Sequence, residues 1–110
     1  MREDLGPEKW EALGHFLSEG DYLGLNRSDY RGAIAQYEKA WELLGTRRLQ
    51  QIWGADILGG IADFASRSGD PDLATDILDS VMLRAAQISD ASLRKACDQL
   101  ELLANQTDQV

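Results

Sequence analysis

Residues 29–45, DYRGAIAQYEKAWELLG, have the spacing of an amphipathic helix. The apolar residues of this stretch recur at intervals of three and four, which places them on one helical face: Ala33, Ile34, Tyr37, Ala40, Trp41 and Leu44. Ser28 or Asp29 is suited to cap the helix, and Gly45 is suited to end it. The stretch therefore predicts one helix with a buried stripe.

Similar periods and boundary residues recur along the chain, and they predict helices only. The expected helices span about 7–25, 29–44, 47–68, 71–85 and 90–106. Thr46, Asp70 and either Ser89 or Asp90 are suited to cap the last three of them. A chain of 110 residues fits one domain, 1–110. The predicted fold class is all-α, with about five antiparallel helices.

Two segments of the chain align without gaps. SDYRGAIAQYEKAWELL, from residue 28, matches GDPDLATDILDSVMLRA, from residue 69, and the match pairs Ala33 with Ala74. Each segment follows a helix that carries large and small residues at similar spacing. In the first helix these are Trp10, Leu13, Gly14 and Leu17, and in the second they are Leu58, Ile61, Ala62 and Ala65. The small residues allow the two helices of a hairpin to pack closely.

These segments resemble the tetratricopeptide repeat, a helix–turn–helix unit of about 34 residues. DYRGAIAQYEKAWELL looks like the second helix of such a unit, and WEALGHFL looks like the first. The resemblance implies two hairpins, about 10–45 and 55–88, and a C-terminal capping helix, about 90–106. Two registers remain open for the first unit. Either Gly14 is the close-packing position, or Gly20-Asp21 is and Trp10 belongs to an N-terminal extension.

Two units are fewer than the three or so that this architecture normally needs for stability. Either the extended first and third helices enlarge the core, or the chain buries surface by pairing with itself or with a partner. A homodimer is therefore one expectation.

The chain is acidic, with a formal net charge of −8. The acidic residues are spread along the whole sequence, and such a protein repels phosphate backbones and anionic lipid headgroups. We therefore expect no nucleic-acid partner, no membrane binding and a basic protein partner. The sequence also has no apolar run typical of a signal peptide or a membrane span, which favours a cytoplasmic location.

Residues suited to catalysis are few. His15 is the only histidine and Cys97 the only cysteine, and no catalytic motif surrounds either of them. The aspartates at 70, 72, 76 and 79 fit a helix cap and a solvated helix face better than a metal site. We expect no enzyme activity, no metal and no cofactor. A hydrolase or transferase that uses His15 is the rival hypothesis from another class.

The resemblance implies a binding surface on the exposed positions of each first helix. In the second unit these are Asp56, Gly59, Gly60, Asp63, Ser66 and Arg67, and Glu19 and Asp21 extend the surface from the first helix. Asp56 and Asp63 are seven residues apart and share one face, and the glycines between them are expected to leave a shallow floor. The alternative is that these carboxylates are ordinary solvated positions. Trp41 and Trp53 are expected to pack in the core rather than to anchor a partner.

YRGAIAQYEKAWELL, followed by IWGADILGGIADF and SGD, is similar to small bacterial repeat proteins encoded beside secreted toxins. The resemblance implies an immunity protein, a non-catalytic module that binds a basic toxin domain, and many such toxins target nucleic acid or nucleotides. The alternative within the same class is a secretion chaperone or assembly scaffold that binds peptide segments in an apolar groove.

Overall fold

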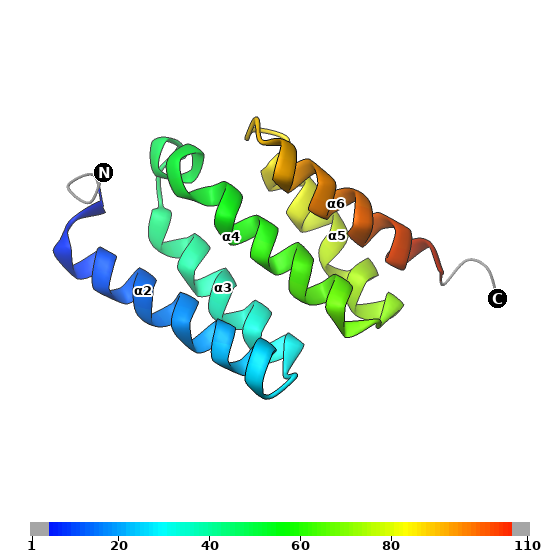
Figure 1. Cartoon of the computed structure of the whole chain (residues 1–110). Coiled ribbons are helices and arrows are strands. Elements are labelled where there is room, and N and C mark those ends of the chain that lie inside the picture. Colours follow the sequence, from blue (N-terminus) through cyan, green and yellow to red (C-terminus); the bar gives the residue numbers. More distant parts are fainter. Residues whose placement is uncertain (1–4, 107–110) are drawn as a thin grey trace.

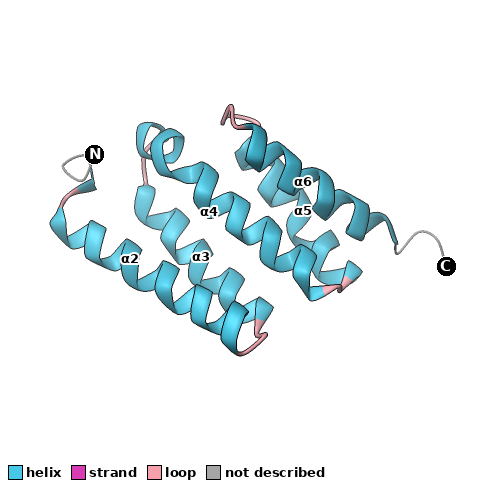
Figure 2. Cartoon of the chain, in the orientation of Figure 1, coloured by secondary structure: helices cyan, strands magenta, loops and turns pink. Residues whose placement is uncertain are grey.

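The computed structural model describes residues 5–106, and the elements in this range are all helical (Figure 1, Figure 2). The elements are α2 (Pro7–Asp21), the π-helix η1 (Tyr22–Asn26), α3 (Tyr30–Leu44), α4 (Arg47–Ser68), α5 (Pro71–Ala85) and α6 (Ala91–Ala104). Because η1 continues α2 directly, the first helical segment extends to Asn26, close to the predicted end. The all-α prediction is confirmed. No helix among residues 5–106 combines the length and apolar content needed to cross a bilayer.

Side-chain caps begin four of the five α-helices, at positions that the sequence predicts. The Asp29 carboxylate accepts a hydrogen bond from the Gly32 amide at 3.0 Å, and the Asp90 carboxylate accepts one from the Leu93 amide at 2.8 Å. Thr46 and Asp70 cap α4 and α5 in the same way. Where the sequence leaves two capping residues open, the structure therefore uses the aspartate each time.

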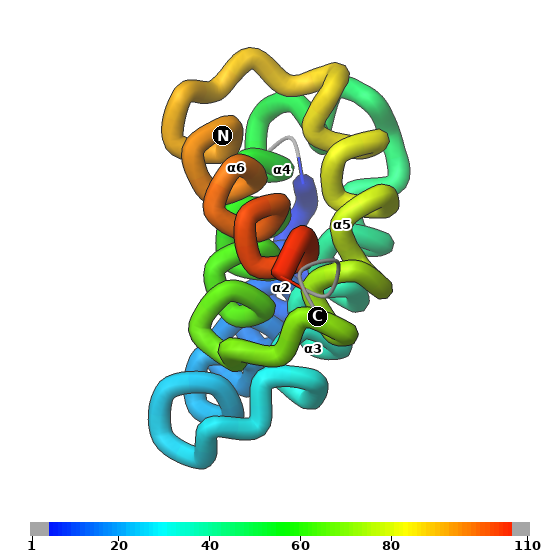
Figure 3. The backbone as a smooth tube through the Cα atoms, turned by 90° about the vertical axis from the view of Figure 1, so that its right-hand side faces the viewer, coloured from blue at the N-terminus to red at the C-terminus, as the bar shows by residue number. Residues whose placement is uncertain are grey.

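The helices form two antiparallel hairpins and a final helix, arranged in two layers. α3 packs against both α2 and α4, while α4, α5 and α6 pack against one another. We call α2, η1, α4 and α6 the front layer, and α3 and α5 the back layer; Figure 3 shows the two layers from the end of the stack. The molecule measures 49 × 30 × 18 Å, so it is a thin slab with two broad faces.

The core lies between the layers. The predicted stripe of α3 is confirmed, since Ala33, Ile34, Tyr37, Ala40 and Leu44 are buried. The largest fully buried side chains of the other helices come mainly from α4 and α6: Ile57, Leu58, Ile61, Val81, Leu93 and Leu100. α4 supplies the most of them because it touches α3, α5 and α6.

The structure selects one of the two registers for the first hairpin. Gly20 is buried, and a Cβ atom added to it would lie 2.6 Å from the Tyr37 ring and 3.2 Å from the Ala33 carbonyl oxygen. Gly14 is exposed, and an added Cβ would meet nothing within 4 Å. Gly20 is therefore the close-packing position, and the segment from Trp10 to Leu17 is an extension before it.

The N-terminal parts of α2 and α4 enlarge the core, as one of the two expectations for this short array requires. The Trp10 and Trp53 rings meet edge to face, with centroids 5.3 Å apart and planes at 60°. Leu13 is buried beside them and belongs to the same core cluster. Side chains of the two extensions therefore connect α2 to α4 within the front layer.

Candidate functional site

Tyr37 reaches from the back layer to the front layer between α2 and α4. A Cβ atom at Gly20 or at Gly60 would overlap its ring, and the Phe64 ring meets it edge to face at 5.3 Å. The hydroxyl at the far end of the ring donates a hydrogen bond of 2.5 Å to Asp21 Oδ1. Two glycines on neighbouring helices thus create the passage that places a tyrosine hydroxyl beside a half-exposed carboxylate.

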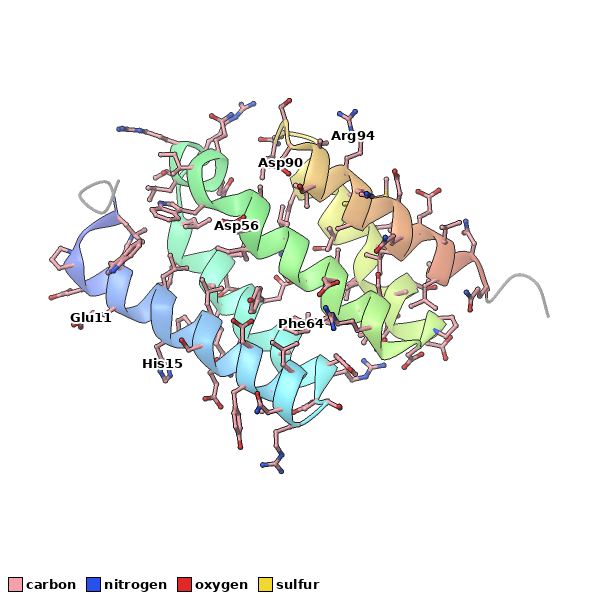
Figure 4. All side chains as sticks on the ribbon, viewed as in Figure 1. Glu11, His15, Asp56, Phe64, Asp90 and Arg94 are labelled. Atoms are coloured by element: carbon pink, nitrogen blue, oxygen red, sulfur yellow. The ribbon has the colours of Figure 1, made fainter. Side chains whose placement is uncertain are left out.

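Three carboxylates lie around this hydroxyl. Burial of Tyr37 is the largest cause that raises its pKa, followed by the hydrogen bond to Asp21 and by the charges of Asp21, Asp56 and Asp63. Asp56 and Asp63 are exposed on α4, and Figure 4 shows Asp56 on the side of α4 that faces α2. We call Asp21, Asp56 and Asp63 the acidic patch. The sequence predicted these three residues as one surface, and the fold brings them together from two helices.

The other predicted site residues differ in their surroundings. Arg67 donates through Nε to Asp63 Oδ2 at 2.7 Å, and both side chains are about half exposed. The Ser66 hydroxyl is buried and has no hydrogen-bond partner among the described residues. Glu19 precedes Asp21 by two residues on α2, so the two side chains point to different sides of the helix. Arg67 therefore adjoins the acidic patch, whereas the Ser66 hydroxyl is not accessible and Glu19 points to another side of α2 than Asp21.

The expected glycine floor between Asp56 and Asp63 exists only in part. Gly59 has open space where a side chain would be. The expectation is wrong at Gly60, because the Tyr37 ring covers this glycine from the back layer. The smallness of Gly60 serves helix packing, whereas the space at Gly59 faces outward.

An apolar groove beside the acidic patch was missed at the sequence level. It lies between the extensions of α2 and α4, has a volume of about 270 Å³ and is lined by Trp10, Leu13, Gly14, Leu17, Trp53, Asp56 and Ile57. The sequence did contain a signal for the groove, since apolar residues recur at helical spacing in both helices. These residues are Trp10, Leu13 and Leu17 in α2 and Trp53 and Ile57 in α4. That spacing looks the same for a filled core and for a partly open groove, so Trp53 was expected to be a core residue.

The two tryptophans expected in the core have different environments. Trp41 lies between the layers, where its ring contacts Gly54 and lies 5.4 Å from the Arg84 guanidinium. Trp53 lines the apolar groove, and its Nε1–H is buried with no acceptor in the part of the chain that is described. A buried donor without an acceptor costs about 1–3 kcal/mol. Core packing explains the position of Trp41, but it does not explain why the indole N–H of Trp53 has no acceptor.

The residues considered for catalysis lie apart. His15 is exposed, and Figure 4 shows it on the outer side of α2, pointing away from α4. Cys97 is buried on α6, and α4 lies between these two helices (Figure 1). Asp70 caps α5, and residues 5–106 contain no group of three or more side chains suited to hold a metal ion.

Comparison with models of protein families, with curated proteins and with solved structures finds no match for this chain. Proposals about its function therefore depend on its fold, its acidic patch and its apolar groove.

Proposed function

We propose that this chain is a non-catalytic protein-binding module that captures a basic protein partner through its front layer. The observation that carries the proposal is the group of three carboxylates near the Tyr37 hydroxyl. Asp21 accepts its hydrogen bond, and the charges of Asp56 and Asp63, from a second helix, also act on it. The net charge of −8 adds a long-range field of the same sign. Such a field attracts a basic partner and raises the rate of encounter.

The particular function we propose is that of an immunity protein for a cognate bacterial toxin. Enzymes that act on nucleic acids or nucleotides present basic surfaces to their anionic substrates. Clustered carboxylates can occupy such a surface and block substrate entry. The proposal follows the resemblance of the sequence pattern to repeat immunity proteins, and the two-hairpin arrangement is compatible with it. It also implies a cytoplasmic location, where such a toxin would act.

A secretion chaperone or assembly scaffold is the second candidate, and the apolar groove favours it. Five of the seven residues that line the groove are apolar with large side chains. A groove of this kind binds extended or helical segments mainly by apolar burial. Binding to such a partner would depend weakly on salt, whereas charge-steered capture of a toxin depends strongly on it.

Affinity purification from the native organism tests the proposed function. Tagged protein is recovered with a moderate salt wash, and the retained proteins are identified by mass spectrometry. We expect one stoichiometric basic partner, derived from the end of a large secreted protein. Several unrelated secretion substrates, or only further copies of this chain, would support a chaperone or a homo-oligomer instead.

A further inference from the structure

The apolar groove has the size of a socket for one or two side chains. Its volume of about 270 Å³ lies just under the range of about 300–1,000 Å³ that is usual for small-molecule pockets. Trp10, Leu17 and Trp53 are only half-buried, so the apolar walls are partly accessible. On the α2 side the rim is Gly14, where an added Cβ would meet nothing within 4 Å. The groove is therefore open at Gly14 and apolar inside.

The charge at the rim of the apolar groove has one sign. Asp56 lines the groove, no basic residue does, and no residue in the described part of the chain forms an ion pair with Asp56. Asp21 and Asp63 lie near the same tyrosine hydroxyl, although Asp63 is already paired with Arg67. Asp56 is thus the member of the acidic patch that is both next to the groove and unpaired.

We propose that the apolar groove receives an aromatic or long aliphatic side chain of a basic protein segment, and that Lys or Arg beside this anchor contacts Asp56. The inference rests on the proposed function and specifies which part of the partner is recognised. A single anchor buried in a pocket supplies much of the affinity at many interfaces, and adjacent charges set register and specificity.

Charge complementarity selects a basic segment over the other possible occupants. A neutral apolar ligand would fill the groove and gain nothing from the charge of the exposed Asp56. A second copy of this chain has a net charge of −8 of its own, which opposes association with a surface of the same sign. A segment with an apolar anchor flanked by Lys or Arg satisfies both the groove and the carboxylate.

The test uses the full chain, labelled with ¹⁵N, and the acetylated peptide KRWKR as the probe. The three tryptophan indole N–H signals report on different places, since Trp10 and Trp53 line the groove and Trp41 lies between the layers. We expect the signals of Trp10 and Trp53 to shift during the titration and that of Trp41 to stay. The peptides KRAKR and EEWEE should each bind at least about tenfold more weakly, a difference of roughly 1.4 kcal/mol.

Gly14→Leu places a large side chain at the rim of the groove and should weaken binding of KRWKR at least about tenfold, equivalent to roughly 1.4 kcal/mol. Gly14→Ala is the matched control, since it changes the same helix position and adds only a Cβ atom in open space. Ala35→Leu, on an exposed position of α3, controls for an added surface leucine. Both controls should bind like the original chain. If Gly14→Leu does not fold, the KRAKR comparison gives the same test from the side of the ligand.

The results separate this inference from the proposed function. Equal binding of KRWKR and KRAKR, or unchanged binding by folded Gly14→Leu, would contradict the proposal that an apolar side chain enters the groove. Equal binding of KRWKR and EEWEE would contradict the proposal that basic residues beside the anchor contact Asp56. If the purified natural partner still needs Asp56 and Asp63 while Gly14→Leu leaves its affinity unchanged, the proposed function stands and the groove inference fails. If the partner needs neither the carboxylates nor the groove, both fail.

Discussion

Tyr37 links the back layer to the acidic patch through one hydrogen bond and two glycine contacts. Its ring touches Gly20 and Gly60, and its hydroxyl donates to Asp21. The ring contributes packing and the hydroxyl contributes a bond to a charged acceptor, so the two contributions can be separated by substitution.

Tyr37→Phe keeps the ring contacts and removes the hydrogen bond to Asp21. Because the acceptor is charged but half-exposed, we expect the free energy of unfolding to fall by about 1–2 kcal/mol. Urea denaturation followed by circular dichroism measures this change. An unchanged midpoint would show that the bond does not contribute to stability.

The raised pKa of Tyr37 makes stability depend on pH in the alkaline range. Burial, the bond to Asp21 and the neighbouring carboxylates hold the native pKa above its ordinary value of 10.0. The unfolded chain then loses this proton first, so the contribution is complete below about pH 10 and is lost as pH rises above it. We expect the original chain to lose more stability above that pH than Tyr37→Phe does. Parallel slopes in denaturation series at several alkaline pH values would contradict this.

Gly59 and Gly60 are adjacent on α4, and we predict opposite changes in stability when each is replaced by alanine. A Cβ at Gly60 would overlap the Tyr37 ring, so Gly60→Ala should destabilise the fold by about 1–3 kcal/mol. Gly59 has open space, so Gly59→Ala should stabilise the helix by about 0.5–1 kcal/mol. Thermal unfolding of the two variants measures both effects. Equal shifts in Tm would contradict the placement of the Tyr37 ring.

At the scale of the elements, we expect the extensions of α2 and α4 to stabilise each other. Trp10 and Trp53 make an edge-to-face contact, and the two helices otherwise meet largely through α3, which packs against both. The extensions therefore form both the enlarged part of the core and the walls of the apolar groove.

A double-mutant cycle with Trp10→Ala and Trp53→Ala measures this dependence. Aromatic pairs of this geometry contribute about 0.5–1.5 kcal/mol beyond their buried area, and we expect a coupling energy in that range. Chemical denaturation of the two single variants and the double variant provides the three values. Additive effects would show that the extensions are stabilised independently.

Helix boundaries were predictable because capping is local. Asp29, Thr46, Asp70 and Asp90 each bond to an amide two or three residues ahead, so the sequence alone contains both the donor and the acceptor. The passage of Tyr37 was not predictable in this way, since Gly20, Tyr37 and Gly60 come from three helices. The sequence predicted Tyr37 as buried but not where its hydroxyl would lie.

The binding site was predicted in part, for a similar reason. Asp56 and Asp63 share a face of one helix, and helical spacing alone shows this. The contribution of Asp21 depended on which register α2 adopts, and only the packing of Gly20 decided it. The apolar groove depends on the distance between α2 and α4. The spacing of residues within one helix contains no information about that distance.

At the scale of the whole molecule, the thin slab presents a front face where an acidic patch adjoins an apolar groove. We predict that a protein partner contacts both the acidic patch and the apolar groove. Charge should govern the rate of association and its salt dependence, while the anchor should govern the rate of dissociation.

The most direct measurement is the Kd of the purified partner for the original chain and two charge variants, at low and moderate salt. Asp56→Lys with Asp63→Lys reverses the patch, and Asp76→Lys with Asp79→Lys makes the same change in net charge on exposed positions of α5. We predict that the patch variant binds at least about tenfold more weakly, or roughly 1.4 kcal/mol, and loses most of the salt dependence, while the α5 variant changes little. Equal loss in both folded variants would show that net charge alone attracts the partner, and no loss in either would contradict a binding site at the acidic patch.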